Sequence, residues 1–235
     1  MREYENYLNV HDGIANKFDQ AVFLKKARSY DRIYSRFLPE SREACILDIG
    51  CGTGLFLCYL RQCGYKNYYG IDVSKENIGF VRQNITDKCE HVNVLEYLQS
   101  KEESFDVVVM NEVLEHISKE NTIKLLELVH KALKANGLFL VLVPNMENPV
   151  TVYTRWHDFT HSTAFTRNSL KMVLRLGGFT DITIYPTIVF TKHSFIKRSI
   201  GGILRYITRK FLERLFEYPR NGILFSKRIF AVTRK

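Results

Sequence analysis

The architecture of this chain can be predicted from ten consecutive residues, Cys45-Ile46-Leu47-Asp48-Ile49-Gly50-Cys51-Gly52-Thr53-Gly54. An apolar run that ends in an aspartate meets three glycines at alternate positions, and apolar residues at helical spacing follow directly. This order is typical of a buried strand, a tight turn and the start of a helix. Glycine lets the backbone adopt positive φ and approach a ligand closely. The segment therefore predicts a ligand-binding turn after the first strand.

The rest of the chain alternates between apolar strand patterns and amphipathic helical patterns. Helices are predicted over 14–38, 74–84, 119–135 and 169–176, and further strands over 67–72, 91–94, 104–111, 138–143, 180–185 and 229–233. Strands that alternate with helices predict a parallel, doubly wound α/β sheet with its site at the carboxyl ends of the strands. Polar residues stand at four of these ends, namely Asp48, Asp72, Asn93 and Asn111.

Composition favours a globular domain in a reducing compartment. The 235 residues are 46% hydrophobic and 25% charged, which is ordinary for a soluble domain. No apolar run reaches the ~18–20 residues of a membrane span, and the polar N-terminus does not resemble a signal peptide. The five cysteines include no C-x-x-C pair, so reduced thiols and a cytoplasmic location are expected.

The net charge of +9 is concentrated near the C-terminus. Residues 186–235 hold 12 Lys and Arg against only Glu213 and Glu217. Within this segment, 196–217 place apolar residues at helical spacing between cations. This pattern predicts an anionic partner, either a membrane surface at the inner face or nucleic acid, the latter being disfavoured. The alternative is an apolar stripe packed on the domain itself.

The glycine segment reads D-x-G-x-G-x-G, not the G-x-G-x-x-G of dinucleotide-binding folds. It resembles the first motif of the class I S-adenosylmethionine (AdoMet) methyltransferases. The resemblance implies a Rossmann-like seven-stranded sheet whose last strand is antiparallel. It also implies one domain, with an N-terminal helical cap (1–43), an AdoMet-binding core (44–185 and 228–235) and a basic helical insertion (186–227).

The same resemblance implies where AdoMet binds. The glycine loop would hold the methionine part, Asp72 the ribose hydroxyls, and Asn111 would lie beside the sulfonium. Asn93 stands where the family usually has an aspartate that contacts the adenine. The implied cofactor-binding residues are Asp48, Gly50, Cys51, Gly52, Gly54, Asp72, Val73, Asn93, Val94 and Asn111.

The segment Glu112-x-x-Glu115-His116 resembles the metal site of the small-RNA 3′-terminal 2′-O-methyltransferases. In that family a later histidine, here His161 in an H-x-x-x-aromatic-T pattern, completes a magnesium site. On a helix start, residues at i, i+3 and i+4 share one face. Mg²⁺, or Mn²⁺, is therefore expected on Glu112, Glu115, His116 and His161, where it would lower the pKa of an acceptor hydroxyl.

The alternative is that Glu115 and His116 only cap or pack the helix while the later histidines are loop residues. His116, His157 or His161 would then serve as a general base.

The loop Arg155-Trp156-His157-Asp158-Phe159-Thr160-His161 resembles that of bacterial methyltransferases acting on surface-polysaccharide sugars. A tryptophan among polar residues suits stacking on a sugar ring, although Trp156 could equally be a packing residue. The leading hypothesis is an AdoMet-dependent O-methyltransferase for a sugar hydroxyl in capsule or O-antigen biosynthesis. The alternatives are an RNA-end or quinone O-methyltransferase, or an AdoMet-binding regulatory subunit without catalysis.

Overall fold

The computed structural model describes residues 19–149, 151–187 and 224–235, and also 202–204, 206–207, 210–211 and 214. Among these residues, no helix has both the length and the apolar character needed to cross a membrane. Most of the predicted amphipathic segment 196–217, and residues 14–18 of the predicted first helix, lie outside the described residues. The described part of 202–214 is helical and exposes Ile203, Leu204, Tyr206, Ile207 and Phe211.

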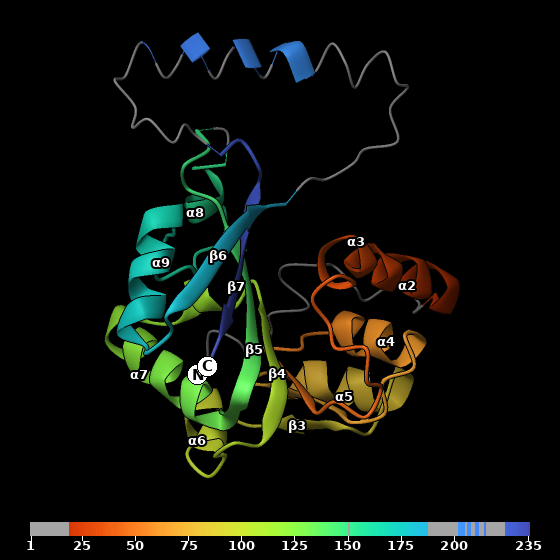
Figure 1. The fold of residues 1–235 in the computed structure, drawn as a ribbon. Helices are drawn as coiled ribbons and strands as arrows, with labels where there is room; N and C mark the ends of the chain where they lie inside the picture. Colours follow the sequence, from red (N-terminus) through yellow and green to blue (C-terminus); the bar gives the residue numbers. More distant parts are fainter. Residues whose placement is uncertain are drawn as a thin grey trace.

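A seven-stranded sheet forms the centre of the molecule, with strand order β3-β2-β1-β4-β5-β7-β6 (Figure 1). The strands are β1 (Ile46–Ile49), β2 (Tyr68–Asp72), β3 (Cys89–His91), β4 (Phe105–Asn111), β5 (Leu133–Pro144), β6 (Asp181–Pro186) and β7 (Arg228–Arg234). The first five strands are parallel, and β7 runs antiparallel to both β5 and β6. The predicted Rossmann-like sheet with an antiparallel last strand is therefore confirmed.

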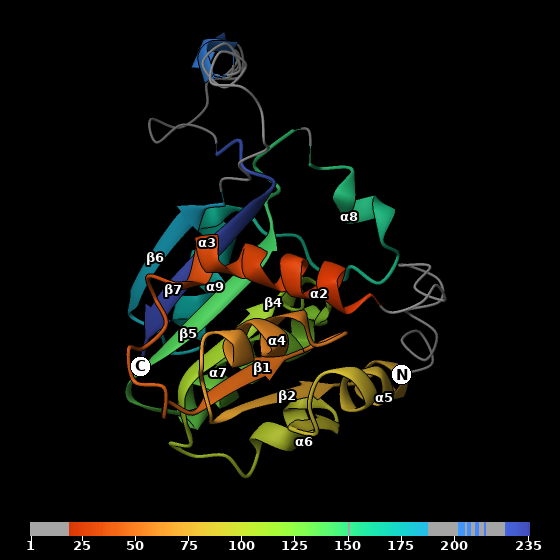
Figure 2. The same ribbon diagram turned by 90° about the vertical axis from the view of Figure 1, so that its right-hand side faces the viewer.

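Helices cover both faces of this sheet. One set consists of α2 (Gln20–Ala27), η2 (Arg28–Tyr30), α3 (Asp31–Tyr34), α4 (Leu55–Gln62) and α5 (Lys75–Asn84). The opposite set consists of α6 (Val94–Leu98), α7 (Lys119–Ala132) and α9 (Arg167–Leu176). In Figure 2 the helices α2, α4 and α5 face the viewer, whereas the short α8 (Thr154–His157) lies apart from both layers.

Two hydrophobic cores hold the layers together. Along β4, Val107 and Val109 belong to the core under α4 and α5, whereas Val108 and Met110 belong to the core under α7 and α9. All four side chains are fully buried. A strand that is covered on both faces reads as a continuous apolar run, which is the pattern seen at 107–110.

The helix predicted over 119–135 is wrong at its end, because α7 stops at Ala132. Leu133 already pairs with Phe105 of β4, and the Ser104 amide donates to the carbonyl of Ala132 at 2.8 Å. The Asn136-Gly137 turn falls inside β5, with Asn136 at φ 62°. Pairing with a neighbouring strand thus ends the helix before its local stop signal.

The strand predicted over 91–94 is also displaced, since β3 covers Cys89–His91. The Asn93 side chain accepts a hydrogen bond from the Leu95 amide at 2.9 Å and caps α6. An asparagine at this position satisfies a free amide of the first helical turn. The strand therefore ends at His91, three residues earlier than predicted.

Gly70 of β2 provides a test of how tightly the sheet packs on α4. A Cβ at this position would lie 2.6 Å from Leu57 Cδ1 and 2.9 Å from Cys51 Sγ. We expect Gly70→Ala to lower the free energy of unfolding by about 1–3 kcal/mol through overpacking. Gly79→Ala in α5 is the control, because a Cβ there meets nothing within 4 Å and should stabilise by about 0.5–1 kcal/mol. Urea unfolding measures both, and equal stability of the two variants would contradict the packing argument.

Candidate active site

The glycine loop between β1 and α4 has the backbone conformation that its sequence predicts. Gly50, Gly52 and Gly54 have φ values of 68°, 52° and 77°, which side chains with a Cβ rarely adopt. A Cβ on Gly50 would also lie 2.4 Å from Val113 Cγ2. The amides of Gly50 and Cys51 both donate to the Ile71 carbonyl, at 2.8 and 3.0 Å. The loop is therefore folded tightly onto the end of β2.

Asp72, at the end of β2, holds the loop from the other side. Its Oδ2 accepts a hydrogen bond from the Gly52 amide at 2.8 Å, and its Oδ1 accepts from the Ser74 amide at 2.8 Å. The Asn77 side chain also donates to Oδ1, at 3.2 Å. Burial raises the pKa of Asp72, although these hydrogen bonds oppose the shift. The proposed contact with a ribose stays a prediction, and positioning of the glycine loop is a role that the sequence did not indicate.

A cavity of about 250 Å³ opens at this edge of the sheet. Of the ten predicted cofactor residues, Asp48, Gly50, Cys51, Gly52 and Asn111 line it. As the described residues outline it, the cavity does not reach Gly54, Asp72, Val73, Asn93 or Val94. The lining also includes residues that sequence reasoning missed, namely Tyr30, Thr53, Leu55, Phe56 and Asn77. Only the predicted N-terminal helical cap, which contains the helical pattern of 14–38, could have indicated Tyr30.

Three buried polar atoms of residues that line this cavity lack a hydrogen-bond partner within the described part of the chain: Asp48 Oδ1, Asn77 Oδ1 and Asn111 Nδ2. The Tyr34 hydroxyl donates to Asn111 Oδ1 and so fixes the orientation of that amide. Burial, and then the charge of Asp72, raise the pKa of Asp48. A buried carboxylate oxygen without a partner favours a cation. These residues therefore fit the positively charged methionine part of AdoMet.

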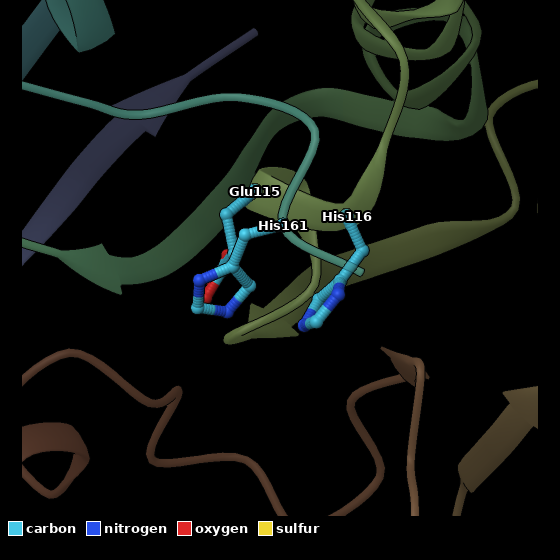
Figure 3. A group of neighbouring side chains, drawn as sticks. All are labelled: Glu115, His116 and His161. Carbon is cyan, nitrogen blue, oxygen red and sulfur yellow. The ribbon is translucent and has the colours of Figure 1, made fainter. Parts of the chain in front are cut away.

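A second polar group lies beyond β4, where η3 (Leu114–His116) follows the strand. Glu115, His116 and His161 each offer a ligand atom within 4.8 Å of the others (Figure 3). Glu115 is 2% exposed, and neither of its carboxylate oxygens has a hydrogen-bond partner among the described residues. Burial raises the pKa of Glu115. Burial, and then the neighbouring His161, lower the pKa of His116, and the centres of the two rings are 4.7 Å apart.

Backbone hydrogen bonds bring His161 to η3 across more than forty residues of sequence. The amides of Ser162 and Thr163 donate to the Glu115 carbonyl at 2.8 and 2.9 Å. The Met146 amide donates to the Phe165 carbonyl at 2.9 Å. These bonds hold the loop that carries His161 against the end of β4.

Glu112 does not join this group. Its backbone is left-handed, with φ 55°, and its carboxylate forms a two-point ion pair with Arg228 of β7 at 2.6 and 3.0 Å. The expectation that Glu112, Glu115 and His116 share one helical face is wrong, because only the single turn of η3 follows β4. Three of the four predicted metal ligands are brought together. His157 also lies outside the group, exposed on α8, with its ring 6.3 Å from that of Tyr153.

Two exposed aromatic side chains lie shortly before His161 in the sequence. Trp156 is 77% exposed and Phe159 is 96% exposed, and the Arg155 guanidinium lies 5.0 Å from the centre of the Trp156 ring. Arg155 also donates to the Ser162 carbonyl at 3.5 Å, which ties α8 to the loop next to His161. Trp156 is therefore not a core packing residue.

Residues 22–184 match the family model described as a methyltransferase domain. An uncharacterised protein of Rickettsia prowazekii is 30% identical over 160 residues, covering 63% of this chain and 64% of that protein. A ubiquinone biosynthesis O-methyltransferase of Sinorhizobium medicae is 36% identical over 98 residues, which cover 37% of this chain and 39% of that protein. The chain thus spans less than two thirds of either relative. A crystal structure of a SAM-dependent methyltransferase from Archaeoglobus fulgidus matches with a TM-score of 0.68 at 22% identity. The match covers 90% of this chain and 94% of that chain, and it shows a shared fold.

The buried carboxylate of Asp48 predicts an unusual dependence of stability on pH. Its pKa is raised in the folded protein, so the stability of the wild type should fall as pH rises from about 4 toward that pKa. Asp48→Asn removes this charge, so the variant should gain stability over the wild type as pH rises to 8. Urea unfolding of the AdoMet-free protein between pH 4 and 8 measures the difference.

Asp106→Asn is the control, because its effect on stability should depend on pH in the opposite direction. Burial acts to raise the pKa of Asp106, but hydrogen bonds from Lys134 and the Cys45 amide outweigh it and lower that pKa. The wild type should therefore be more stable than Asp106→Asn at neutral pH, and this difference in the free energy of unfolding should shrink as the pH falls. If the stability of the two variants relative to the wild type changed with pH in the same direction, the raised pKa of Asp48 would be contradicted.

Proposed function

This chain belongs to the methyltransferase domain family and is an AdoMet-dependent methyltransferase, and from this premise we propose that it methylates a sugar hydroxyl in surface-polysaccharide biosynthesis, of capsule or O-antigen. The observation that carries the proposal is the group of Glu115, His116 and His161. Arg155, which contacts the exposed Trp156 ring, donates to the carbonyl next to His161, and Glu112, just before the group, lines the AdoMet cavity. This group provides what a hydroxyl acceptor needs, and Trp156 provides a surface for its ring.

The chemistry requires a base. AdoMet supplies a methyl group on a positively charged sulfur, and transfer forms a carbon–oxygen bond as the carbon–sulfur bond breaks. An alcohol is a poor nucleophile until its proton leaves. His116 is suited to take that proton, because its lowered pKa keeps the ring neutral near pH 7. The charge of Asp158, which acts to raise the pKa of His116, would stabilise the imidazolium that forms.

The same three side chains also suit a divalent metal ion. A carboxylate and two imidazoles favour a borderline ion such as Mn²⁺ over Mg²⁺, which prefers oxygen ligands. Glu115, His116 and His161 would hold the ion, while Glu112 is engaged by Arg228. When bound, such an ion would lower the pKa of the acceptor hydroxyl. The two unpartnered oxygens of buried Glu115 support this use.

The surroundings of the group favour a sugar acceptor. An exposed indole can stack on the face of a sugar ring, while nearby polar groups bind the hydroxyls at its edge. Arg155, which contacts the Trp156 ring, and exposed His157 are polar groups on the same short helix. The described residues therefore supply both kinds of contact on α8.

A quinone acceptor is the second candidate, because two of the relatives are ubiquinone biosynthesis O-methyltransferases, from Sinorhizobium medicae and Bartonella quintana. These alignments cover 37% and 43% of this chain. An RNA-end acceptor is the third. All three supply a hydroxyl, so the group at Glu115 serves each of them.

A panel of acceptors tests the proposal. We expect methyl transfer from labelled AdoMet to nucleotide sugars, and not to demethylated quinols or RNA ends. Trp156→Ala should raise KM for the sugar by about tenfold, the loss of one stacking contact of about 1–1.5 kcal/mol. Met172→Ala, a similarly exposed apolar residue on α9, should leave KM unchanged. Methylation of only the quinol or the RNA would contradict the sugar assignment.

The metal is tested with the acceptor that the panel identifies. EDTA should abolish turnover without changing AdoMet affinity, and Mn²⁺ should restore it. Glu115→Gln should lower kcat by about 100-fold or more, whereas the same change at Glu120, exposed on α7, should leave kcat within about threefold. Full activity in excess EDTA would exclude the ion and leave His116 and His161 as candidate bases.

A further inference from the structure

Two residues outside the three-residue group, Asp158 and Thr160, are linked to the His116 ring by hydrogen bonds. Thr160 Oγ1 lies 2.8 Å from His116 Nδ1 and 2.6 Å from Asp158 Oδ1. The Thr160 amide donates to the same carboxylate oxygen at 2.9 Å. Asp158 is 7% exposed, so its carboxylate is largely shielded from water. None of these contacts is explained by methyl-donor binding.

The direction of these hydrogen bonds follows from counting protons. An ionised carboxylate can only accept, and a threonine hydroxyl has one proton to give. The 2.6 Å contact with Asp158 uses that proton. The Thr160 oxygen can then only accept from His116, so His116 Nδ1 must carry the hydrogen. In a neutral imidazole the lone pair is then on Nε2.

We propose that Asp158 and Thr160 are positioning residues that hold His116 in the Nδ1–H tautomer and so turn the Nε2 lone pair into the site. The use of that lone pair, as a base or as a metal ligand, rests on the function proposed above. The tautomer itself is a property of the protein without AdoMet, ion or acceptor. With the other tautomer, His116 would present an N–H group, which can neither take a proton nor bind a cation.

Asp158 also lies against the second imidazole. Its Oδ2 is 3.9 Å from His161 Nε2, and its carbonyl accepts a hydrogen bond from the His161 amide at 3.2 Å. One buried carboxylate thus faces both histidines, one directly and one through Thr160. This explains why a short loop can place two rings from distant parts of the sequence with their centres 4.7 Å apart.

Long-range ¹H–¹⁵N NMR of the AdoMet-free, metal-free protein tests the proposal. The His116→Gln spectrum identifies the His116 signals. The wild type and Thr160→Ser, which keeps the hydroxyl, should show a protonated Nδ1 and an unprotonated Nε2. Thr160→Val, which has the same shape without the hydroxyl, should shift most of the population to the Nε2–H form. A protonated Nε2 in the wild type overturns the proposal, and so does an unchanged tautomer in Thr160→Val.

Calorimetric titration with Mn²⁺ alone provides a second readout. Loss of a partner that orients a ligating histidine typically weakens metal affinity by about 10–100-fold. We expect that loss in Thr160→Val and wild-type affinity in Thr160→Ser. Wild-type affinity in a Thr160→Val protein that has changed tautomer would overturn the positioning role. If the wild type binds no Mn²⁺ but shows the Nδ1–H tautomer, the metal of the proposed function fails and the arrangement of Asp158, Thr160 and His116 stands.

Discussion

Asp48 of β1 lies in register with Gly70 of β2 and Val109 of β4, and all three strands are parallel. Because parallel strands end at the same edge of a sheet, this register brings Asp48, Asp72 and Asn111 to one place. The glycine loop, the cavity and η3 all begin at that edge. The rest of the site therefore depends on the parallel pairing of these three strands, which the two buried hydrophobic layers hold in place.

This arrangement leaves three buried carboxylate oxygens without hydrogen-bond partners among the described residues, one on Asp48 and two on Glu115. Asp48 Oδ1 faces the cavity, and both oxygens of Glu115 lie beside the two histidines. Leaving such groups unpaired destabilises the folded state. Proteins tolerate this at sites where a ligand supplies the missing partner. In the function proposed above, these two carboxylates mark the two halves of the reaction site, Asp48 for the methyl donor and Glu115 for the acceptor.

The acceptor half is built from distant pieces of chain. Glu115 and His116 come from η3, His161 comes from the loop after α8, and the backbone of Glu115 receives hydrogen bonds from that loop. The neighbouring Glu112 is drawn away by Arg228 of β7, on the far side of β5. The last strand therefore decides which carboxylate remains available to the histidines. The basic segment predicted to bind an anionic surface ends close to Arg228 in sequence, and its contact stays a prediction.

The sequence by itself determined the sheet, its order of elements and the glycine loop, because apolar periodicity and glycines with positive φ are local signals. It also indicated the histidine group, through residue types at a recognisable spacing. Only the tertiary structure decided that Leu133 pairs in β5 instead of extending α7, that Arg228 engages Glu112, and that Thr160 orients His116. Each of these depends on a partner far away in the sequence. Local propensity carries no information about such a partner, because only the folded chain brings the two residues together.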